Sequence, residues 1–278
     1  MGLYFTSINS GSNGNCYYVG NENEAILVDV GLTCKEVENR MLRLGLSVKK
    51  IKAIFISHEH SDHIKGLSVF AKKHKLPVYI SSLTLKSSKL LLDEQNTFSL
   101  THSQKIKIGN LNISAFSKFH DAADPYSFTV ECNDVRVGVF TDIGSVCDRL
   151  ISHFKNCHAA FLEANYCADM LANGSYPYFL KRRITSGYGH LSNTQALALF
   201  QSHKPEYMTH LLLSHLSKDN NDPILVESLF KNVAGNTIVK VASRYGESEV
   251  YYVSQDQTST HAYSFDPSLH QPEQLNLF

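Results

Sequence analysis

Three imidazoles and the carboxylate of Asp62 lie within the six residues 58–63, whose sequence is HEHSDH. Neutral imidazole and carboxylate together bind borderline transition metals such as zinc, manganese or iron. One ion does not need this many ligands from so short a stretch. Two ions are therefore the simplest interpretation if more ligands follow downstream. The alternative is a solvated His-rich loop that binds nothing, and no packing requirement explains this spacing.

The chain around this stretch indicates how such side chains would be positioned. The stretch directly follows residues 53–56, an apolar run of strand length, which places it in a loop at the end of a buried strand. Three further candidate ligands follow strand-like runs downstream: His120 after 111–116, Asp142 after 135–140, and His215 after 207–213. A carboxylate can bridge two ions, whereas imidazole cannot. Taken alone, Asp142 would instead be a helix N-cap before Val146.

Length and composition set outer limits on the protein. The chain has 278 residues, of which 43% are hydrophobic and 19% charged, and this suits one large domain or two small ones. The formal net charge is +0, so a polyanion would need a local basic patch. We expect a cytoplasmic protein without a transmembrane helix or signal peptide. Six cysteines without a Cys-x-x-Cys pair indicate reduced thiols.

The remaining segments alternate between strand-like and helix-like patterns. Strands are predicted at 3–8, 16–19, 25–29, 77–80, 159–162, 237–241 and 249–253, and helices at 33–44, 66–74, 83–92 and 223–233. Two capping boxes mark helix starts, Thr33 with Glu36 and Ser192 with Gln195. The second box places His190 on the loop before a helix. The small polar loop 9–15 is either a plain turn or a loop whose N–H groups line an anion site.

The HEHSDH stretch matches the His-x-His-x-Asp-His signature, and here the chain resembles the metallo-β-lactamase fold superfamily. The rest of that family's pattern is found in the same order downstream. The resemblance implies an α/β protein with an αβ/βα four-layer sandwich over residues 1–253, followed by a polar tail at 254–278. The β-CASP nucleases of the superfamily carry a large second domain after the bridging Asp. The interval from Asp142 to Glu163 leaves no room for one.

The resemblance also implies roles, residue by residue. Two divalent ions, zinc or manganese, are expected. One would be held by His58, His60 and His120, the other by Asp62, His63 and His215, with Asp142 bridging the two. Asp62 would also orient the attacking water or take its proton, as expected between two close ions. Asp29 falls where the superfamily often has an Asp that supports the metal loop from behind.

The substrate is inferred from further likenesses. Glu163, followed later by Gly189-His190, resembles ribonuclease Z, in which a Glu and a His form a proton relay at the leaving group. The bacterial WalJ/YycJ branch of metal-dependent DNA nucleases is similar at 10–12, 189–193 and 214–221, except for the charged pair Lys218-Asp219. A DNA exonuclease in repair or replication is therefore expected. A thioester or lactone hydrolase of the same fold would need neither relay nor basic groove, and a vestigial binding module would not keep all the ligands.

Two other stretches point to partners. Lys181, Arg182 and Arg183 form a basic triplet between Glu163 and His190, and it either follows a phosphate backbone or is a solvated face. Gln274, Leu275, Leu277 and Phe278 resemble the motif by which proteins bind the bacterial sliding clamp. In this interpretation the Gln amide fixes the register and the apolar side chains fill a pocket. The alternative is that Leu277 and Phe278 fold back onto the domain.

Overall fold

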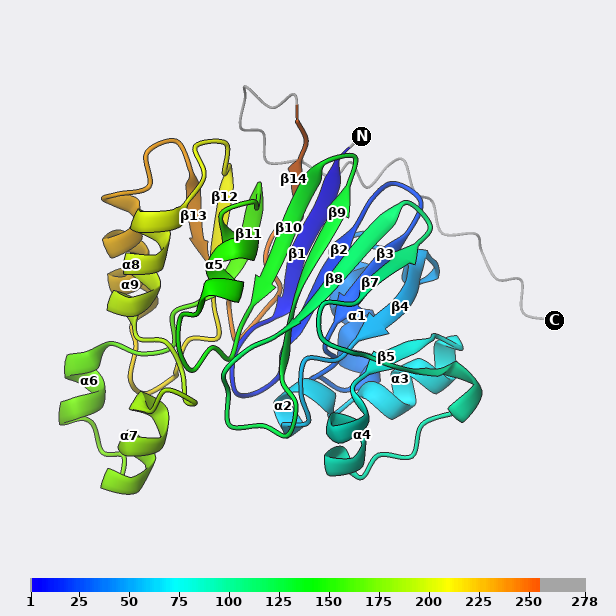
Figure 1. Ribbon diagram of the computed structural model, residues 1–278, viewed down its shortest axis with the longest axis horizontal. Helices are drawn as coiled ribbons and strands as arrows, with labels where there is room; N and C mark the ends of the chain where they lie inside the picture. The colour runs from blue at the N-terminus through cyan, green and yellow to red at the C-terminus, as the bar shows by residue number, and fades with distance from the viewer. Residues whose placement is uncertain (1, 256–278) are drawn as a thin grey trace.

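A computed structural model of the protein describes residues 2–255 and contains two seven-stranded sheets (Figure 1). The first sheet has the order β14 (Tyr251–Val253), β1 (Leu3–Asn9), β2 (Cys16–Gly20), β3 (Ala25–Val28), β4 (Ile51–Phe55), β5 (Val78–Ile80) and β6 (Thr97–Ser99). The second has the order β13 (Ile238–Val241), β12 (His210–Ser214), β11 (Ala159–Glu163), β10 (Val135–Phe140), β9 (Tyr126–Cys132), β8 (Leu111–Ser117) and β7 (Lys105–Ile108).

The two sheets pack face to face over an apolar core. Side chains from both sheets meet there, and the ring of Phe161 lies 5.8 Å from Phe5 and 4.9 Å from Tyr17, centroid to centroid. Since these strands carry apolar side chains on both faces, each sheet must also be covered on its outer face. The predicted α/β fold, an αβ/βα four-layer sandwich, is confirmed.

Helices supply the two outer layers. The first sheet packs against α1 (Cys34–Arg43) and α3 (Leu67–His74), with α4 (Ser82–Ser88) nearby; the second packs against α5 (Asp148–Phe154), α8 (Asn193–His203) and α9 (Pro223–Lys231). Three other helices lie at the lower edge in Figure 1: α2 (Ser61–Ile64), α6 (Ala168–Asn173) and α7 (Tyr178–Thr185). Within the described residues, no helix is both long and apolar enough to cross a bilayer.

One edge of the sandwich gathers the ends of many strands. The pairs β3–β4 and β4–β5 are parallel, as are β10–β11 and β11–β12, so their carboxyl ends point the same way. The loops after β4, β10, β11 and β12 therefore emerge together. The predicted metal ligands lie in these loops, on the short helix α2 that follows the β4 loop, and in the loop that joins β8 to β9.

Several local predictions differ from the structure. The helix predicted at 83–92 ends at Ser88, because Lys89 turns into the left-handed region at φ 55°. Thr33 caps α1 as predicted, but the Glu36 carboxylate accepts from Arg40 Nε at 2.7 Å and does not complete a capping box. The Ser192 and Gln195 box is confirmed. Between Asp142 and Glu163 the chain forms α5 and then β11, and all six cysteines are free.

Candidate metal centre

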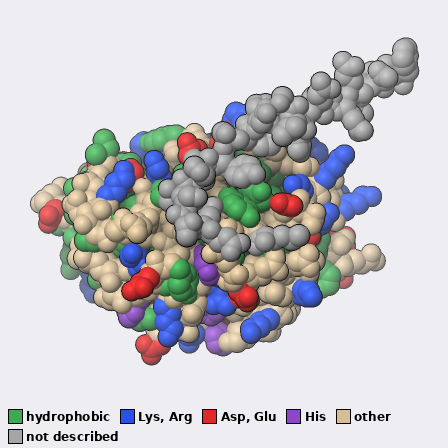
Figure 2. All heavy atoms as spheres, turned by 90° about the horizontal axis from the view of Figure 1, so that it is seen from above, with side chains coloured by type: hydrophobic (Ala, Val, Ile, Leu, Met, Phe, Trp, Pro, Cys, Tyr) green, Lys and Arg blue, Asp and Glu red, His purple; other side chains and the backbone are tan. Residues whose placement is uncertain are grey.

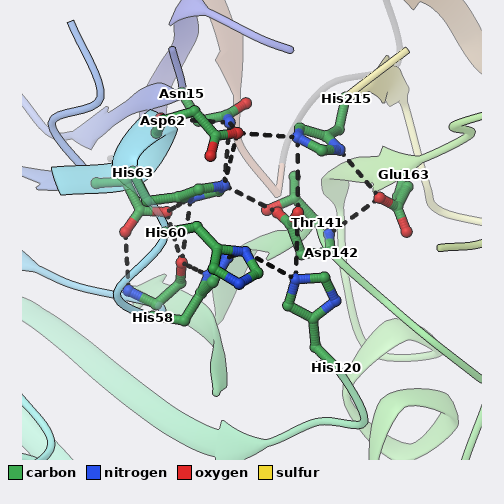
Figure 3. Close-up of polar contacts among 12 residues, drawn as sticks. Asn15, His58, His60, Asp62, His63, His120, Thr141, Asp142, Glu163 and His215 are labelled. Atoms are coloured by element: carbon green, nitrogen blue, oxygen red, sulfur yellow. Dashed lines mark hydrogen bonds and ion pairs between the residues drawn. The ribbon is translucent and has the colours of Figure 1, made fainter. Parts of the chain in front are cut away.

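The first predicted ligand group is assembled at the edge where the strands end. His58 Nε2 lies 3.0 Å from His60 Nδ1, and His120 Nε2 lies 3.4 Å from the same Nδ1 atom. Figure 3 shows the three rings pointing toward one another. His58 and His60 come from the loop after β4, and His120 comes from the loop after β8, so each sheet contributes to this group.

The second group lies beside the first. Asp62 Oδ2 is 3.5 Å from His63 Nε2 and 3.5 Å from His215 Nε2. Asp62 and His63 sit on the single-turn helix α2, whereas His215 directly follows β12. The three atoms lie within 4.8 Å of one another, which is a spacing that one ion can span.

Asp142 lies between the two groups. Its Oδ1 atom is 3.8 Å from His120 Nε2 and 3.5 Å from His215 Nε2, and its Oδ2 atom is 3.3 Å from His63 Nε2. Asp142 Oδ2 and His215 Nε2 are buried and have no hydrogen-bond partner among the described residues. Buried polar atoms are normally hydrogen-bonded, and buried atoms without a partner are explained when a ligand such as an ion binds there. The donor set therefore fits divalent cations at both groups.

A layer of hydrogen bonds behind the ligands fixes the rings. Asp29 Oδ2 lies 2.7 Å from His63 Nδ1, and Asp29 also accepts from the backbone N–H and hydroxyl of Ser57. Ser57 Oγ lies 2.8 Å from His58 Nδ1, and His120 Nδ1 lies 3.0 Å from the carbonyl of Gly189. Such bonds at Nδ1 leave Nε2 free to face an ion. The expected support from Asp29 is present in the structure.

Glu163 holds the other side of the site together. Its Oε1 atom lies 2.8 Å from His190 Nδ1 and 3.1 Å from His215 Nδ1, and its Oε2 atom accepts from the backbone N–H groups of Ile143 and Leu191. Glu163 is completely buried, whereas the His190 side chain keeps 18% exposure. Glu163 is therefore an orienting residue, and His190 is the member of the pair that can meet a substrate.

Charge differs between the two ligand groups. Burial lowers the pKa of His58, His60 and His120, in the case of His120 to about 3, so these imidazoles are neutral and suited to coordinate an ion.

In the second group, burial also lowers the pKa of His63 and His215, but carboxylates outweigh it. Asp142, Asp29 and Asp62 raise the pKa of His63 well above its ordinary value, and Asp142 and Asp62 raise that of His215 to about 10. Because several carboxylates meet here, this half of the site attracts positive charge.

The backbone is unusual at three of these positions. Asp29, Asp142 and His215 have φ of 62°, 54° and 56°, in the left-handed region that most side chains avoid. Each follows the end of a strand, namely β3, β10 or β12. Non-glycine residues in this region concentrate at functional sites, where the surrounding structure holds them in place.

The structure reveals contributors that the sequence did not single out. Asn15 Nδ2 donates to Asp62 Oδ2 at 3.1 Å, and the Asn15 side chain also accepts from Gly11 N. The turn interpretation of loop 9–15 fits this bonding, since the N–H groups of Gly11, Gly14 and Asn15 are used within the protein. Gly31 permits the close approach of its own backbone to that of Asp62, because a Cβ at this position would lie 1.7 Å from the Asp62 carbonyl oxygen.

Lys118 is a second contributor that no sequence signal pointed to. It is only 6% exposed, and its Nζ donates to the carbonyl of Thr141 at 2.6 Å. This bond holds the backbone directly before Asp142. Burial lowers the pKa of Lys118.

The basic triplet lies on α7 and is largely engaged within the protein. Lys181 Nζ donates to the carbonyl of Ala172 at 2.7 Å, and Arg183 forms an ion pair with Asp121. The guanidinium of Arg182 lies 5.9 Å from the ring centre of Tyr178. Contact with a phosphate backbone therefore stays a prediction, and Arg182 is the member best placed for it.

Comparison with known proteins agrees with this geometry. Residues 10–107 match the sequence profile of the metallo-beta-lactamase superfamily. The chain is 37% identical over 226 residues to exodeoxyribonuclease YycJ of Bacillus anthracis, covering 80% of this chain and 85% of that protein. It is 32% identical over 226 residues to exodeoxyribonuclease WalJ of Streptococcus pneumoniae, covering 80% and 84%.

A solved structure supports the fold independently. The metallo-beta-lactamase fold protein YhfI of Bacillus subtilis superposes with a TM-score of 0.71 over 91% of this chain and 100% of that one, at 19% identity. A likeness at this identity shows the shared fold alone. The two exodeoxyribonucleases are similar over most of their own length, and this places the chain within one branch of the family.

Proposed function

Since this chain belongs to the metallo-β-lactamase superfamily, in the branch of YycJ and WalJ, and is a metal-dependent hydrolase, we propose that it is a DNA exonuclease with two divalent ions. Zinc or manganese suits a donor set made only of nitrogen and oxygen. One ion would be held by His58, His60 and His120 and the other by Asp62, His63 and His215, with Asp142 between them. We further propose that the enzyme acts in DNA repair or replication.

The chemistry divides between the ions and the protein's own residues. When bound, two close divalent ions provide a nucleophile near neutral pH and stabilise charge on the attacked phosphorus. Asp62 lies at the rim of the second ligand group, with 19% side-chain exposure, and would orient the attacking water. His190, held at Nδ1 by Glu163, would present Nε2 to the leaving oxygen as a general acid.

The pairing of Glu163 with His190 carries this proposal. An alkoxide leaving group is poor, so a phosphodiester needs a proton donor at that position, whereas a thioester leaves readily without one. His190 Nδ1 lies 2.8 Å from the buried carboxylate of Glu163, and this hydrogen bond orients the imidazole as a proton donor requires. The pair also resembles the one expected from ribonuclease Z.

We expect protein loaded with Mn²⁺ or Zn²⁺ to shorten labelled DNA from an end, releasing mononucleotides or short products. The panel should contain single-stranded DNA, duplex DNA, a circular DNA, RNA, a thioester and a lactone. Resistance of the circular substrate distinguishes exonuclease from endonuclease action. Turnover of the thioester or lactone with intact DNA would instead support the alternative hydrolase, and a preference for RNA would correct the substrate class.

All six cysteines are free, and this supports a cytoplasmic location, where thiols stay reduced.

The clamp motif lies outside the described residues, and binding to the bacterial sliding clamp remains a proposal from its sequence. We expect the full chain to bind the clamp with a Kd on the order of micromolar, because so short a motif makes few contacts with its partner. A chain in which Gln274, Leu275, Leu277 and Phe278 are replaced by Ala is the matched control. Equal binding by both chains, or none by either, contradicts the proposal without affecting the metal chemistry.

A further inference from the structure

Basic residues are concentrated in one part of the chain. Residues 39–92 contain 11 of the 26 Lys and Arg residues but only two of the 26 Asp and Glu residues. Those two, Glu59 and Asp62, belong to the ligand stretch at 58–63. Because the whole chain is neutral, its other segments carry an excess of acidic residues. The zero net charge therefore hides a strongly basic segment.

The fold brings lysines from two elements of this segment together. One pair lies on η1 (Val48–Lys50) and at the start of β4, and the other lysines lie at the carboxyl end of α3. Lys49, Lys52 and Lys75 line one surface hollow, and Lys72, Lys73 and Lys75 line a second. Lys75 therefore joins the two groups. The five side chains are called the lysine face below.

Few of these charges are neutralised by the protein. Within residues 2–255, Lys73 is the only one of the five in an ion pair, with Glu38 at 2.7 Å. Glu38 and Asp93 are the acidic residues that line the two hollows, and Asp93 pairs with no lysine there. The four remaining lysines repel one another, and an anionic partner would relieve that repulsion.

Stabilisation of α3 explains only part of the lysine face. Basic side chains in the last turn of a helix interact favourably with its carbonyl groups, and this accounts for Lys72 and Lys73. It does not account for Lys49 and Lys52, which come from other elements. Lys75 has φ 52°, in the left-handed region where glycine commonly ends a helix. A function for its amino group would explain a lysine at this position.

Helices α2 and α3 link the lysine face to the metal centre. Asp62 and His63 lie on α2, Lys65 follows it with an exposed side chain, and α3 begins two residues later. Figure 1 shows α3 to the right of α2, and Figure 2 shows Lys and Arg side chains projecting from the right-hand end of the molecule. The 8 residues of α3 span about 12 Å, which is roughly three to four base pairs of DNA.

We propose that the lysine face binds the phosphate backbone of the DNA substrate outside the metal centre. This rests on the proposed nuclease function and adds to it a second contact with the same DNA molecule. Phosphates a few base pairs from the hydrolysed end would lie against the lysine amino groups. Lysine binds phosphate as a point charge, so the contact adds affinity without reading sequence. It would keep the DNA bound between successive cleavages.

Salt dependence provides the first test. Binding is measured by fluorescence anisotropy on metal-loaded protein, with labelled duplex DNA whose phosphorothioate linkages resist hydrolysis. Lys49→Gln, Lys72→Gln and Lys75→Gln combined should lower the affinity on the order of tenfold at about 50 mM salt. The slope of log affinity against log salt should become shallower by about two to three, equally for unrelated sequences. Unchanged affinity and slope overturn the proposal.

Two matched variants locate the effect. Replacement of the same three lysines by Arg keeps the charges and should keep both affinity and slope. Lys155→Gln, Lys231→Gln and Lys240→Gln combined removes three exposed lysines from the second sheet and its helices, and should leave DNA binding unchanged. A loss in this control as large as that in the lysine-face variant contradicts the assignment to this face.

DNA length decides the question even if the Gln variant fails to fold, which melting temperature and metal content show. The unmodified protein is titrated with duplexes of about 4 and about 20 base pairs, each closed at one end by an uncharged linker. The shorter duplex ends near the start of the lysine face, so its salt slope should be shallower than that of the longer one. Equal slopes for the two duplexes overturn the proposal.

A second anionic surface separates DNA from a membrane. Binding of phosphatidylglycerol vesicles through these lysines, with the DNA affinity unchanged in the Gln variant, would assign the face to a membrane instead. The two proposals also fail in different ways. DNA hydrolysis with an unchanged salt slope removes only the lysine face, whereas the expected change in slope without hydrolysis of any nucleic acid removes the nuclease.

Discussion

Asp142→Asn is expected to lower the metal content below two equivalents and to reduce kcat on the order of 10³-fold or more. The estimate follows from the several kcal/mol of charge stabilisation that a metal pair supplies. Asp142 lies within 3.8 Å of three imidazole nitrogens that belong to both ligand groups. Replacing the charged oxygen by an amide removes the negative charge that a second ion requires and leaves the shape of the side chain.

Asn is the better replacement here because Asp142 has φ 54°. Asn tolerates the left-handed region, whereas Ala at this position adds backbone strain to the loss of a ligand. Elemental analysis of protein purified without chelator, together with kcat on the preferred DNA, measures both effects. Asp134→Asn, a change at an exposed carboxylate that shares the left-handed backbone with φ 62°, controls for charge. Full retention of two metals in the Asp142→Asn protein would contradict the bridging role.

His190→Ala is expected to keep both metals and to lose 10²- to 10⁴-fold in kcat, the range typical of a lost general acid. His190 Nδ1 is held by Glu163 at 2.8 Å and lies 3.9 Å from Asp142 Oδ1, while the ring remains partly exposed. Since its bond is to Glu163, removal of the imidazole leaves the ligand rings in place. A diester with an activated nitrophenolate leaving group needs no such proton and should lose much less.

Glu163→Gln provides the contrast. Glu163 orients both His190 and His215, so this change should reduce metal content as well as turnover. The two variants thus separate a proton donor from a residue that supports a ligand. A parallel loss of metal and activity in His190→Ala, or equal losses on the DNA and the activated diester, would assign His190 a structural or ligand role instead.

The sequence predicted the parts of the protein that depend on local pattern. Continuous apolar runs ended at polar residues, so the strand at 135–140 was placed residue for residue and the candidate ligands were placed in the segments that follow β4, β10 and β12. The capping box at Ser192 located the loop of His190.

Other features depend on tertiary packing, and no local pattern predicts them. The short strands β6 and β7 are partly exposed and become strands only by pairing with neighbours. Lys118 is a basic residue whose buried Nζ donates a hydrogen bond to a carbonyl distant in sequence, that of Thr141. The left-handed backbone at Asp29, Asp142 and His215 is imposed by the surrounding fold, since Asp and His rarely adopt it unaided.

The division of the ligands between two sheets sets the moment at which this enzyme can first act. His58, His60 and His63 leave the ribosome soon after strands β1 to β4, whereas Asp142 and His215 follow β10 and β12, which are made much later. A nascent or truncated chain that ends before β12 carries only part of the ligand set. If all these residues bind metal, we expect hydrolytic activity to begin only when synthesis has passed β12 and the second sheet has packed against the first.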